Sequence, residues 1–214
     1  MRRRDFLRMS IGVLGTALLY PVANAGAATE WVDNWWGSET AEGSALPDVA
    51  SPGHLTISPG KFCEGRLRLK SPIHGEAYEF KFRDTAGNYD PKVLAALNWF
   101  LRCRDGSWQY MDIRTIESLN YVSALLGVPE ITINSGYRSP TYNKQLAKKN
   151  ENVARNSLHQ YGQAIDYGIP GIPIREVCSY TLYARDMMGY GGVGYYPRAN
   201  FVHLDSGSIK EWVR

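Results

Sequence analysis

The ten residues from Ser157 to Asp166 constrain this chain of 214 residues more than any other segment does. They read Ser-Leu-His-Gln-Tyr-Gly-Gln-Ala-Ile-Asp, which places His159 and Asp166 on either side of a glycine turn. A later run, Phe201-Val-His-Leu-Asp205, adds a second histidine, His203. A catalytic zinc ion takes three nitrogen, oxygen or sulfur ligands from the protein and keeps a fourth position for water. His159, Asp166 and His203 form such a set, so the sequence predicts a zinc site with one ion per chain.

The charge of this ligand set predicts the chemistry of the site. Two neutral imidazoles and one carboxylate leave a divalent ion with a formal charge of about +1, and such an ion can lower the pKa of its bound water toward ~7. Hydroxide held on a metal at neutral pH is the nucleophile of a hydrolase. We therefore expect hydrolytic chemistry.

Both ligand-bearing segments show the alternation of β-strands. From Gln163 to Ile169, Asp166 shares one face with small residues, while large apolar side chains take the other face and are expected to point into the core. In the later strand, His203 and Asp205 share a face and lie roughly 6.6 Å apart along it. Asp205 is therefore expected either among the metal ligands or behind one of them.

Two blocks carry a resemblance to a known family. The chain resembles the zinc D-Ala-D-Ala peptidases of bacterial cell walls, which share the hedgehog/DD-peptidase fold. Their signature, Ser-x-His-x-x-Gly-x-Ala-x-Asp, matches Ser157 to Asp166 at every fixed position, and Ser135–Asn143 matches their upstream Ser-Gly-Tyr-Arg-Ser block. The resemblance runs from about Asp90 to Asp205. Through Gly191–Arg198 it is closest to twin-arginine-exported murein endopeptidases of proteobacteria.

The resemblance implies a fold and a set of residue roles. It implies an α+β fold of the hedgehog/DD-peptidase type, an antiparallel sheet with helices packed around it. The two histidines and Asp166 would bind zinc, Arg138 would steady the substrate or the developing oxyanion, and Ser157 would help to bind substrate. The residues alone leave a structural ion pair open for Arg138, and a turn-forming hydroxyl open for Ser157.

One position departs from the family pattern. Many members carry a glutamate or aspartate three residues before the second histidine as the general base, and this chain has Asn200 there. An amide cannot accept the proton. Asp205 is the best-placed carboxylate to replace it, but orienting a histidine ligand suits the same position. In the other alternative, hydroxide on the zinc ion acts with only hydrogen-bonded help. The sequence leaves these alternatives open.

The implied function is zinc-dependent hydrolysis of peptide cross-links in peptidoglycan, that is, a murein endopeptidase. One alternative keeps the enzyme and changes the bond, making it a D,D-carboxypeptidase or dipeptidase that trims a terminal D-Ala. Another is a zinc-containing module that binds peptidoglycan without catalysis. The bond that is cleaved and the oligomeric state are not determined by the sequence.

The first 25 residues have the pattern of a twin-arginine signal peptide. Arg3-Arg-Asp-Phe-Leu7 is the twin-arginine motif, Ile11–Tyr20 is apolar, and Ala23-Asn-Ala25 is a cleavage site. The apolar stretch, of roughly ten to twelve residues, is too short to cross ~30 Å of hydrocarbon, so no stable membrane span is expected after cleavage. The predicted location is the periplasm, reached through the twin-arginine export machinery.

The rest of the chain is predicted to be a tether and one domain. Residues 26–53 are rich in small residues and proline and are expected to be extended, and residues 54–214 are the predicted zinc peptidase domain. The formal charge of +3 lies in the leader, which holds four arginines and one aspartate. The mature chain is therefore formally neutral and gives no electrostatic case for binding nucleic acid.

Local patterns predict further elements. Asp90-Pro91, Asp112 and Ser139-Pro140 each mark the start of a helix. Three cysteines permit at most one internal disulfide, and Cys103 and Cys178 are expected in helices as buried small residues. Another helix is expected over Pro173–Met188, and strands over His54–Ser58, Arg66–Lys70, Tyr78–Arg83, Ile131–Ile133, Val193–Tyr196 and Phe201–Asp205.

Overall fold

The structure is a computed structural model that describes residues 64–127, 129–151 and 153–214. The predicted leader, the tether and the strand expected at His54–Ser58 lie outside the described residues, as does Cys63. None of the described helices is long and apolar enough to cross a membrane.

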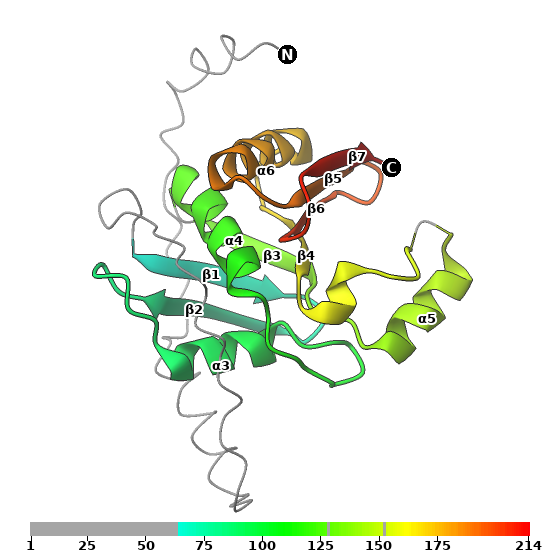
Figure 1. The fold of residues 1–214 in the computed structure, drawn as a ribbon, viewed down its shortest axis with the longest axis horizontal. Helices are drawn as coiled ribbons and strands as arrows, with labels where there is room; N and C mark the ends of the chain where they lie inside the picture. The colour runs from blue at the N-terminus through cyan, green and yellow to red at the C-terminus, as the bar shows by residue number, and fades with distance from the viewer. Residues whose placement is uncertain (1–63, 128, 152) are drawn as a thin grey trace, which may run out of the picture.

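The described residues form one seven-stranded sheet in the order β2-β1-β3-β4-β6-β5-β7 (Figure 1). Four α-helices and one 3-10 turn accompany it. The strands are β1 (Gly65–Ser71), β2 (Glu76–Arg83), β3 (Glu130–Ser135), β4 (Ala164–Gly168), β5 (Gly192–Tyr196), β6 (Phe201–Asp205) and β7 (Lys210–Val213). The helices are α3 (Pro91–Phe100), α4 (Ile113–Leu125), α5 (Pro140–Lys149) and α6 (Ile174–Met188), and the 3-10 turn is η1 (Leu158–Tyr161).

The sheet is mixed, so the expectation of an antiparallel sheet was wrong. β1 runs parallel to β3 and β5 runs parallel to β7, while the other neighbouring pairs are antiparallel. The first parallel pair arises because α3 and α4 carry the chain from β2 across to β3, and parallel neighbours need such a long connection. The second arises because a short turn reverses the chain after β6, and β6 is itself antiparallel to β5.

The predicted helix starts are confirmed by their caps. The Asp90 side chain accepts hydrogen bonds from two backbone N–H groups in the first turn of α3, and Asp112 accepts one in α4. The Ser139 hydroxyl accepts one from Tyr142 in α5. Pro173 is the N-cap of α6, whose end at Met188 agrees with the prediction. The side chains of Asp90, Asp112 and Ser139 satisfy N–H groups that have no partner within the helix.

One face of the sheet carries the core and the other carries the predicted ligands. Ile165 and Tyr167 of β4 lie opposite Leu204 and Val202 of β6, and all four are buried. The Tyr167 hydroxyl lies 2.6 Å from the Thr181 hydroxyl of α6, which shows that this helix covers the apolar face. Successive side chains in a strand point to opposite faces, so Asp166 lies on the face away from α6, as the alternation predicts.

One of the two described cysteines lies outside the helix in which it was expected. Cys103 was expected in a helix, but it lies just beyond the C-cap of α3, Leu101, so the helix is shorter than its apolar pattern suggests. Cys178 is in α6 as expected. Both thiols are buried and free, in agreement with a packing role. The last strand, β7, was not predicted from the sequence.

Gly162 joins η1 to β4 and is expected to tolerate no side chain. Its φ is +66°, and an added Cβ would lie 2.3 Å from the carbonyl oxygen of Tyr110. Gly171 is a matched control, because its φ is +80° but nothing lies within 4 Å of an added Cβ. We expect Gly171→Ala to lose about 1 kcal/mol of unfolding free energy, and Gly162→Ala about 3 kcal/mol or more, because backbone must move as well. Urea denaturation measures both, and equal losses would contradict the packing argument.

Candidate metal centre

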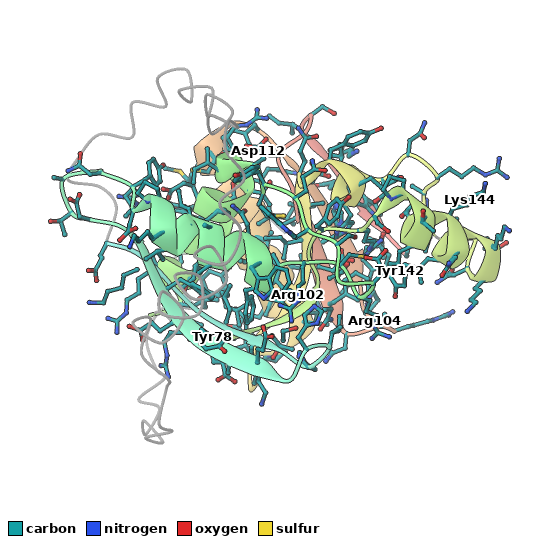
Figure 2. All side chains as sticks on the ribbon, turned by 90° about the horizontal axis from the view of Figure 1, so that it is seen from below. Tyr78, Arg102, Arg104, Asp112, Tyr142 and Lys144 are labelled. Carbon is teal, nitrogen blue, oxygen red and sulfur yellow. The ribbon has the colours of Figure 1, made fainter. Side chains whose placement is uncertain are left out.

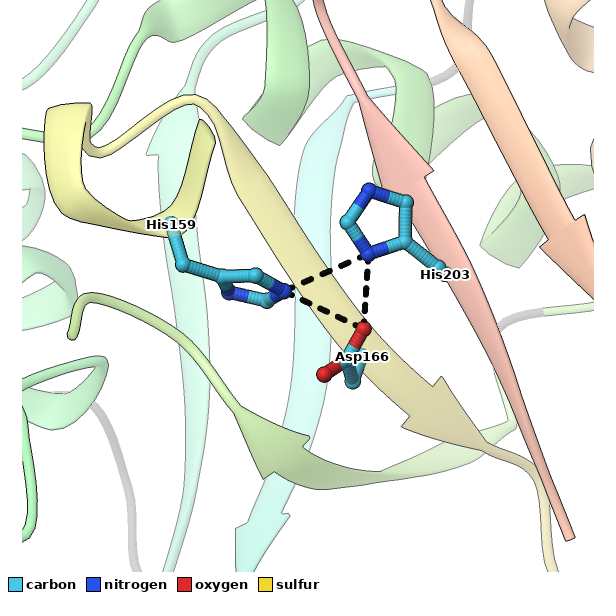
Figure 3. A group of neighbouring side chains, drawn as sticks. All are labelled: His159, Asp166 and His203. Atoms are coloured by element: carbon cyan, nitrogen blue, oxygen red, sulfur yellow. Dashed lines mark hydrogen bonds and ion pairs between the residues drawn. The ribbon is translucent and has the colours of Figure 1, made fainter. Parts of the chain in front are cut away.

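Three side-chain atoms on the polar face of the sheet converge on one point (Figure 3). His159 Nε2 lies 3.2 Å from His203 Nδ1 and 3.2 Å from Asp166 Oδ1, and the last two atoms are 2.8 Å apart. Nitrogen and oxygen ligands at ~2.0–2.1 Å from a tetrahedral ion are themselves roughly 3.3 Å apart. The three atoms thus fit around one metal ion with little rearrangement.

Strand pairing and one tight turn bring the three residues together. Asp166 and His203 are direct partners in the antiparallel pair of β4 and β6, so their side chains leave the sheet side by side. His159 lies in η1, and the turn at Gly162 directs the chain from η1 into β4. All three side chains are buried. The structure therefore brings together the three ligands that the sequence predicts.

A hydrogen bond on the far side of its ring orients His159. Its Nδ1 lies 2.7 Å from the carbonyl oxygen of Gly136, to which it donates. The remaining ring nitrogen, Nε2, is then the unprotonated one and faces Asp166 and His203. Histidines that bind metals commonly donate their second N–H in this way, which fixes the tautomer.

Asp205 orients the His203 ring, as the Gly136 carbonyl orients that of His159. His203 Nε2 lies 3.2 Å from Asp205 Oδ2, so the opposite ring nitrogen, Nδ1, faces the other ligand atoms. Asp205 Oδ1 accepts backbone hydrogen bonds from Gly192 at 2.7 Å and Gly207 at 2.9 Å. The carboxylate is fully buried and both oxygens are engaged. It stands behind a predicted ligand rather than among the converging atoms.

Arg138 is held beside the second oxygen of Asp166. Its Nη2 donates to Asp166 Oδ2, its Nε donates to the Ser135 hydroxyl at 2.8 Å, and its backbone N–H donates to the His159 carbonyl at 3.0 Å. The side chain is 14% exposed. The ion pair with an acid near the turn, which the sequence left open, is therefore present, and the guanidinium also borders the cleft.

Ser157 and Asn200 differ in their relation to the site. Ser157 is the N-cap of η1, but its hydroxyl makes no capping hydrogen bond and lines the cleft. Asn200 is exposed in the turn between β5 and β6, with a φ of 55°. It is not among the residues that line the cleft. The position at which the resemblance would place a base therefore carries an exposed amide in this chain.

Trp212 of β7 borders the site and was missed from the sequence. His203 pairs with Gly194 of β5, and Gly194 pairs with Trp212. The indole lies over Gly194, where an added Cβ would come within 2.6 Å of it. Its centroid is 5.2 Å from that of the His203 ring, and its Nε1 donates to the Tyr196 hydroxyl at 3.0 Å. A glycine next to a ligand strand was the available signal, because it often marks the close approach of another group.

The electrostatics of the cluster favour two of the three ligands in their metal-binding forms. Burial lowers the pKa of His159 to about 4, so this imidazole is neutral near neutral pH. Burial alone would raise the pKa of Asp166, but His159, His203 and Arg138 outweigh it and hold that pKa well below its usual range. For His203, the hydrogen bonds to Asp166 and Asp205 outweigh burial and raise the pKa. A metal ion at this position would compete with a proton for His203 Nδ1.

The predicted ligands border a cleft with two lobes: all three line one lobe, and Asp166 also lines the other. One lobe, of about 370 Å³, is bounded by the end of α3, the segment after β3 and the start of α5. The other, of about 480 Å³, is bounded by η1, the turn between β5 and β6, and β7. Arg138, Asp166 and Phe201 line both lobes. The predicted metal position therefore faces the 480 Å³ lobe, and the 370 Å³ lobe adjoins it at Arg138 and Asp166.

Because the Trp212 indole occupies the space over Gly194, adding a methyl group there should disturb His203. We expect Gly194→Ala to weaken the binding of a divalent ion by about tenfold, the low end of the effect of altering groups around metal ligands. Gly168→Ala, also on a strand, is the control, because its added Cβ would meet nothing closer than 3.4 Å. Titration with Zn²⁺ against a competing chelator measures both. Unchanged affinity in Gly194→Ala would contradict a supporting role for the indole.

Comparison with known proteins places the chain in a family. The family model described as peptidoglycan L,D-endopeptidase MepK matches residues 64–212. The peptidoglycan L,D-endopeptidase MepK of Escherichia coli (strain K12) is 38% identical over 175 residues, which cover 80% of this chain and 91% of that protein. A probable peptidoglycan L,D-endopeptidase MepK of Haemophilus influenzae is 34% identical over 149 residues, or 68% of this chain and 77% of that protein.

No solved structure matches the chain. The resemblance to the cell-wall peptidases is confirmed, while the twin-arginine leader, which lies outside the residues that the family model matches, stays a prediction. The agreement of the family match with the convergent His-Asp-His cluster and its open cleft leads to one conclusion: this chain belongs to the MepK family of peptidoglycan endopeptidases.

Proposed function

We propose that this chain is a zinc peptidase that hydrolyses L,D peptide cross-links of peptidoglycan in the periplasm. The observation that carries the proposal is the convergent His-Asp-His cluster, which lines one lobe of a cleft and adjoins the second lobe at Asp166. The two adjoining lobes offer room for a cross-linked peptide, which extends on both sides of its scissile bond. The family's name supports the L,D bond, and the donor set supports zinc, which takes nitrogen and oxygen ligands in a tetrahedral arrangement.

The residues have distinct roles in this proposal. His159 Nε2, Asp166 Oδ1 and His203 Nδ1 hold the zinc ion, which when bound polarises a carbonyl and acidifies a water molecule. Arg138 uses Nε and Nη2 for Ser135 and Asp166, which leaves Nη1 without a partner among the described residues. That group is available to a carbonyl oxygen as it gains charge. The Ser157 hydroxyl, which caps nothing, is available to the peptide backbone of the substrate.

Asp205 is proposed as a positioning residue. Its oxygens are engaged by His203 and by two backbone N–H groups, and the side chain is buried. Among the described residues that line the cleft, Asp166 and Asp205 are the only carboxylates. A carboxylate base is therefore not part of the proposed mechanism. Asp205 instead holds His203 with Nδ1 toward the metal position.

The open cleft also bears on the two alternative functions. A carboxypeptidase or dipeptidase binds a free terminus, which favours a pocket closed at one end, whereas here a second lobe adjoins the ligand-lined lobe at Asp166. A zinc-containing binding module would hold its ion with the same neutral histidines and ionised carboxylate, so release of products is what separates it from the enzyme. Both alternatives are outcomes of the experiments below.

Replacing His159 should remove the activity without unfolding the chain. We expect His159→Ala to release no soluble muropeptides from purified sacculi, because the ion loses one of its three protein ligands. Wild-type protein treated with a chelator should behave in the same way and recover when Zn²⁺ is restored. Circular dichroism checks the fold, and mass spectrometry of the products identifies the bond.

The products also separate the alternatives. Release by His159→Ala equal to that of the wild type would contradict the proposal. Binding to sacculi without any release by the wild type would favour the binding module. Loss of only a terminal D-Ala would favour the carboxypeptidase.

Asp205→Asn distinguishes positioning from base catalysis. An amide keeps the size of the side chain but weakens its hold on the His203 N–H, so we expect zinc affinity to fall ten- to a hundredfold. Activity should then recover substantially when zinc is raised to saturation. Zinc affinity is read by competition with a chelator and activity by turnover on a muropeptide dimer. Unchanged zinc affinity with a rate loss of 10²–10⁴ at saturating zinc would instead identify Asp205 as the base.

A further inference from the structure

Each lobe of the cleft carries an arginine that no acid neutralises. Arg104 lines the 370 Å³ lobe and Arg198 lines the 480 Å³ lobe. Both side chains are exposed, and among residues 64–127, 129–151 and 153–214 no carboxylate forms an ion pair with either. Each guanidinium is therefore available to an anion that enters its lobe.

The other arginines of the cleft, Arg102, Arg138 and Arg214, already have partners. Arg102, in the same lobe as Arg104, donates to both oxygens of Glu76, at 3.1 Å and 2.7 Å. Figure 2 labels Arg102 and Arg104 together with Tyr142 of α5, and all three line this lobe. In the other lobe, the Lys210 ammonium lies 5.3 Å from the centre of the Trp212 ring. Arg138 pairs with Asp166 at the junction. Among the described arginines that line the cleft, Arg104 and Arg198 are thus the two whose side chains have no ion pair, and they line different lobes.

The chemistry of an L,D cross-link matches this arrangement. Where such a bond joins two diaminopimelate residues, the acyl group comes from the L-centre of one residue and the nitrogen from the D-centre of the other. The bond consumes neither D-centre carboxylate, so one carboxylate remains on each side of the scissile amide. A D,D cross-link has D-Ala on its acyl side, and that residue has no carboxylate left once it is linked.

We propose that Arg104 and Arg198 are specificity-determining residues, each binding the D-centre carboxylate of one of the two joined diaminopimelate residues. A planar guanidinium makes two parallel hydrogen bonds to a carboxylate, which fixes its direction as well as its charge. The two arginines would hold the cross-link across the metal position. The arginine on the acyl side would also distinguish an L,D bond from a D,D bond. This inference rests on the proposed function.

The test compares two synthetic muropeptide dimers with the same L,D bond. One carries free D-centre carboxylates, and in the other both are carboxamides. For Arg104→Ala and Arg198→Ala we expect kcat/KM on the carboxylate dimer to fall about tenfold or more, mainly through KM, in line with one lost charge-assisted contact each. On the carboxamide dimer the same variants should change by less than about twofold, because an amide offers the guanidinium no charge. Arg175→Ala, an exposed arginine of α6 that lines neither lobe, is the matched control.

A binding measurement separates this inference from the proposed function. The uncleaved dimers are titrated calorimetrically into His159→Ala, with and without each arginine substitution. The inference is supported if the carboxylate dimer binds more tightly than the carboxamide dimer and this difference disappears with Arg104→Ala or Arg198→Ala. That holds even if the wild type hydrolyses neither dimer. Absence of hydrolysis would overturn only the proposed function. Equal loss on both dimers, or no loss on either, would overturn the inference even if the wild type cleaves the L,D bond.

Discussion

The rest of the site depends on the interactions of the Asp166 carboxylate with its neighbours. Its Oδ1 faces the two imidazoles, and its Oδ2 accepts from Arg138. One buried anion therefore orients the ligand cluster and the cation beside it. The β4–β6 register places Asp166 opposite His203, and a slip by one residue would turn one of the two side chains to the apolar face. The core packing that fixes this register thus also fixes the candidate metal centre.

The convergence of His159, Asp166 and His203 was predictable from the sequence because their spacing is local or tied to strand alternation. His159 and Asp166 are joined by one turn and one strand, and the caps of α3, α4 and α5 are set by Asp90, Asp112 and Ser139. The direction of pairing was not predictable. Alternation fixes which face a side chain takes but not which strand lies beside it, so the parallel neighbours β1 and β3 were missed.

The role of Asp205 and the presence of Trp212 could not be read from the pattern either. Alternation placed Asp205 on the face of His203, but only the observed hydrogen bonds assign its oxygens to the His203 ring and to Gly192 and Gly207. Trp212 reaches His203 because β7 pairs with β5 next to Gly194, a contact that depends on tertiary structure. The two-lobed cleft also depends on tertiary structure, because its walls come from segments far apart in the chain.

The central claim is that one zinc ion binds at His159 Nε2, Asp166 Oδ1 and His203 Nδ1. Anomalous diffraction at the zinc absorption edge, on crystals of the zinc-loaded protein, tests it most directly. The account predicts one strong peak within ~2.0–2.2 Å of these three atoms, with His203 Nε2 turned toward Asp205. A peak at another cluster, or His203 binding zinc through Nε2 with Asp205 as a ligand, would contradict it.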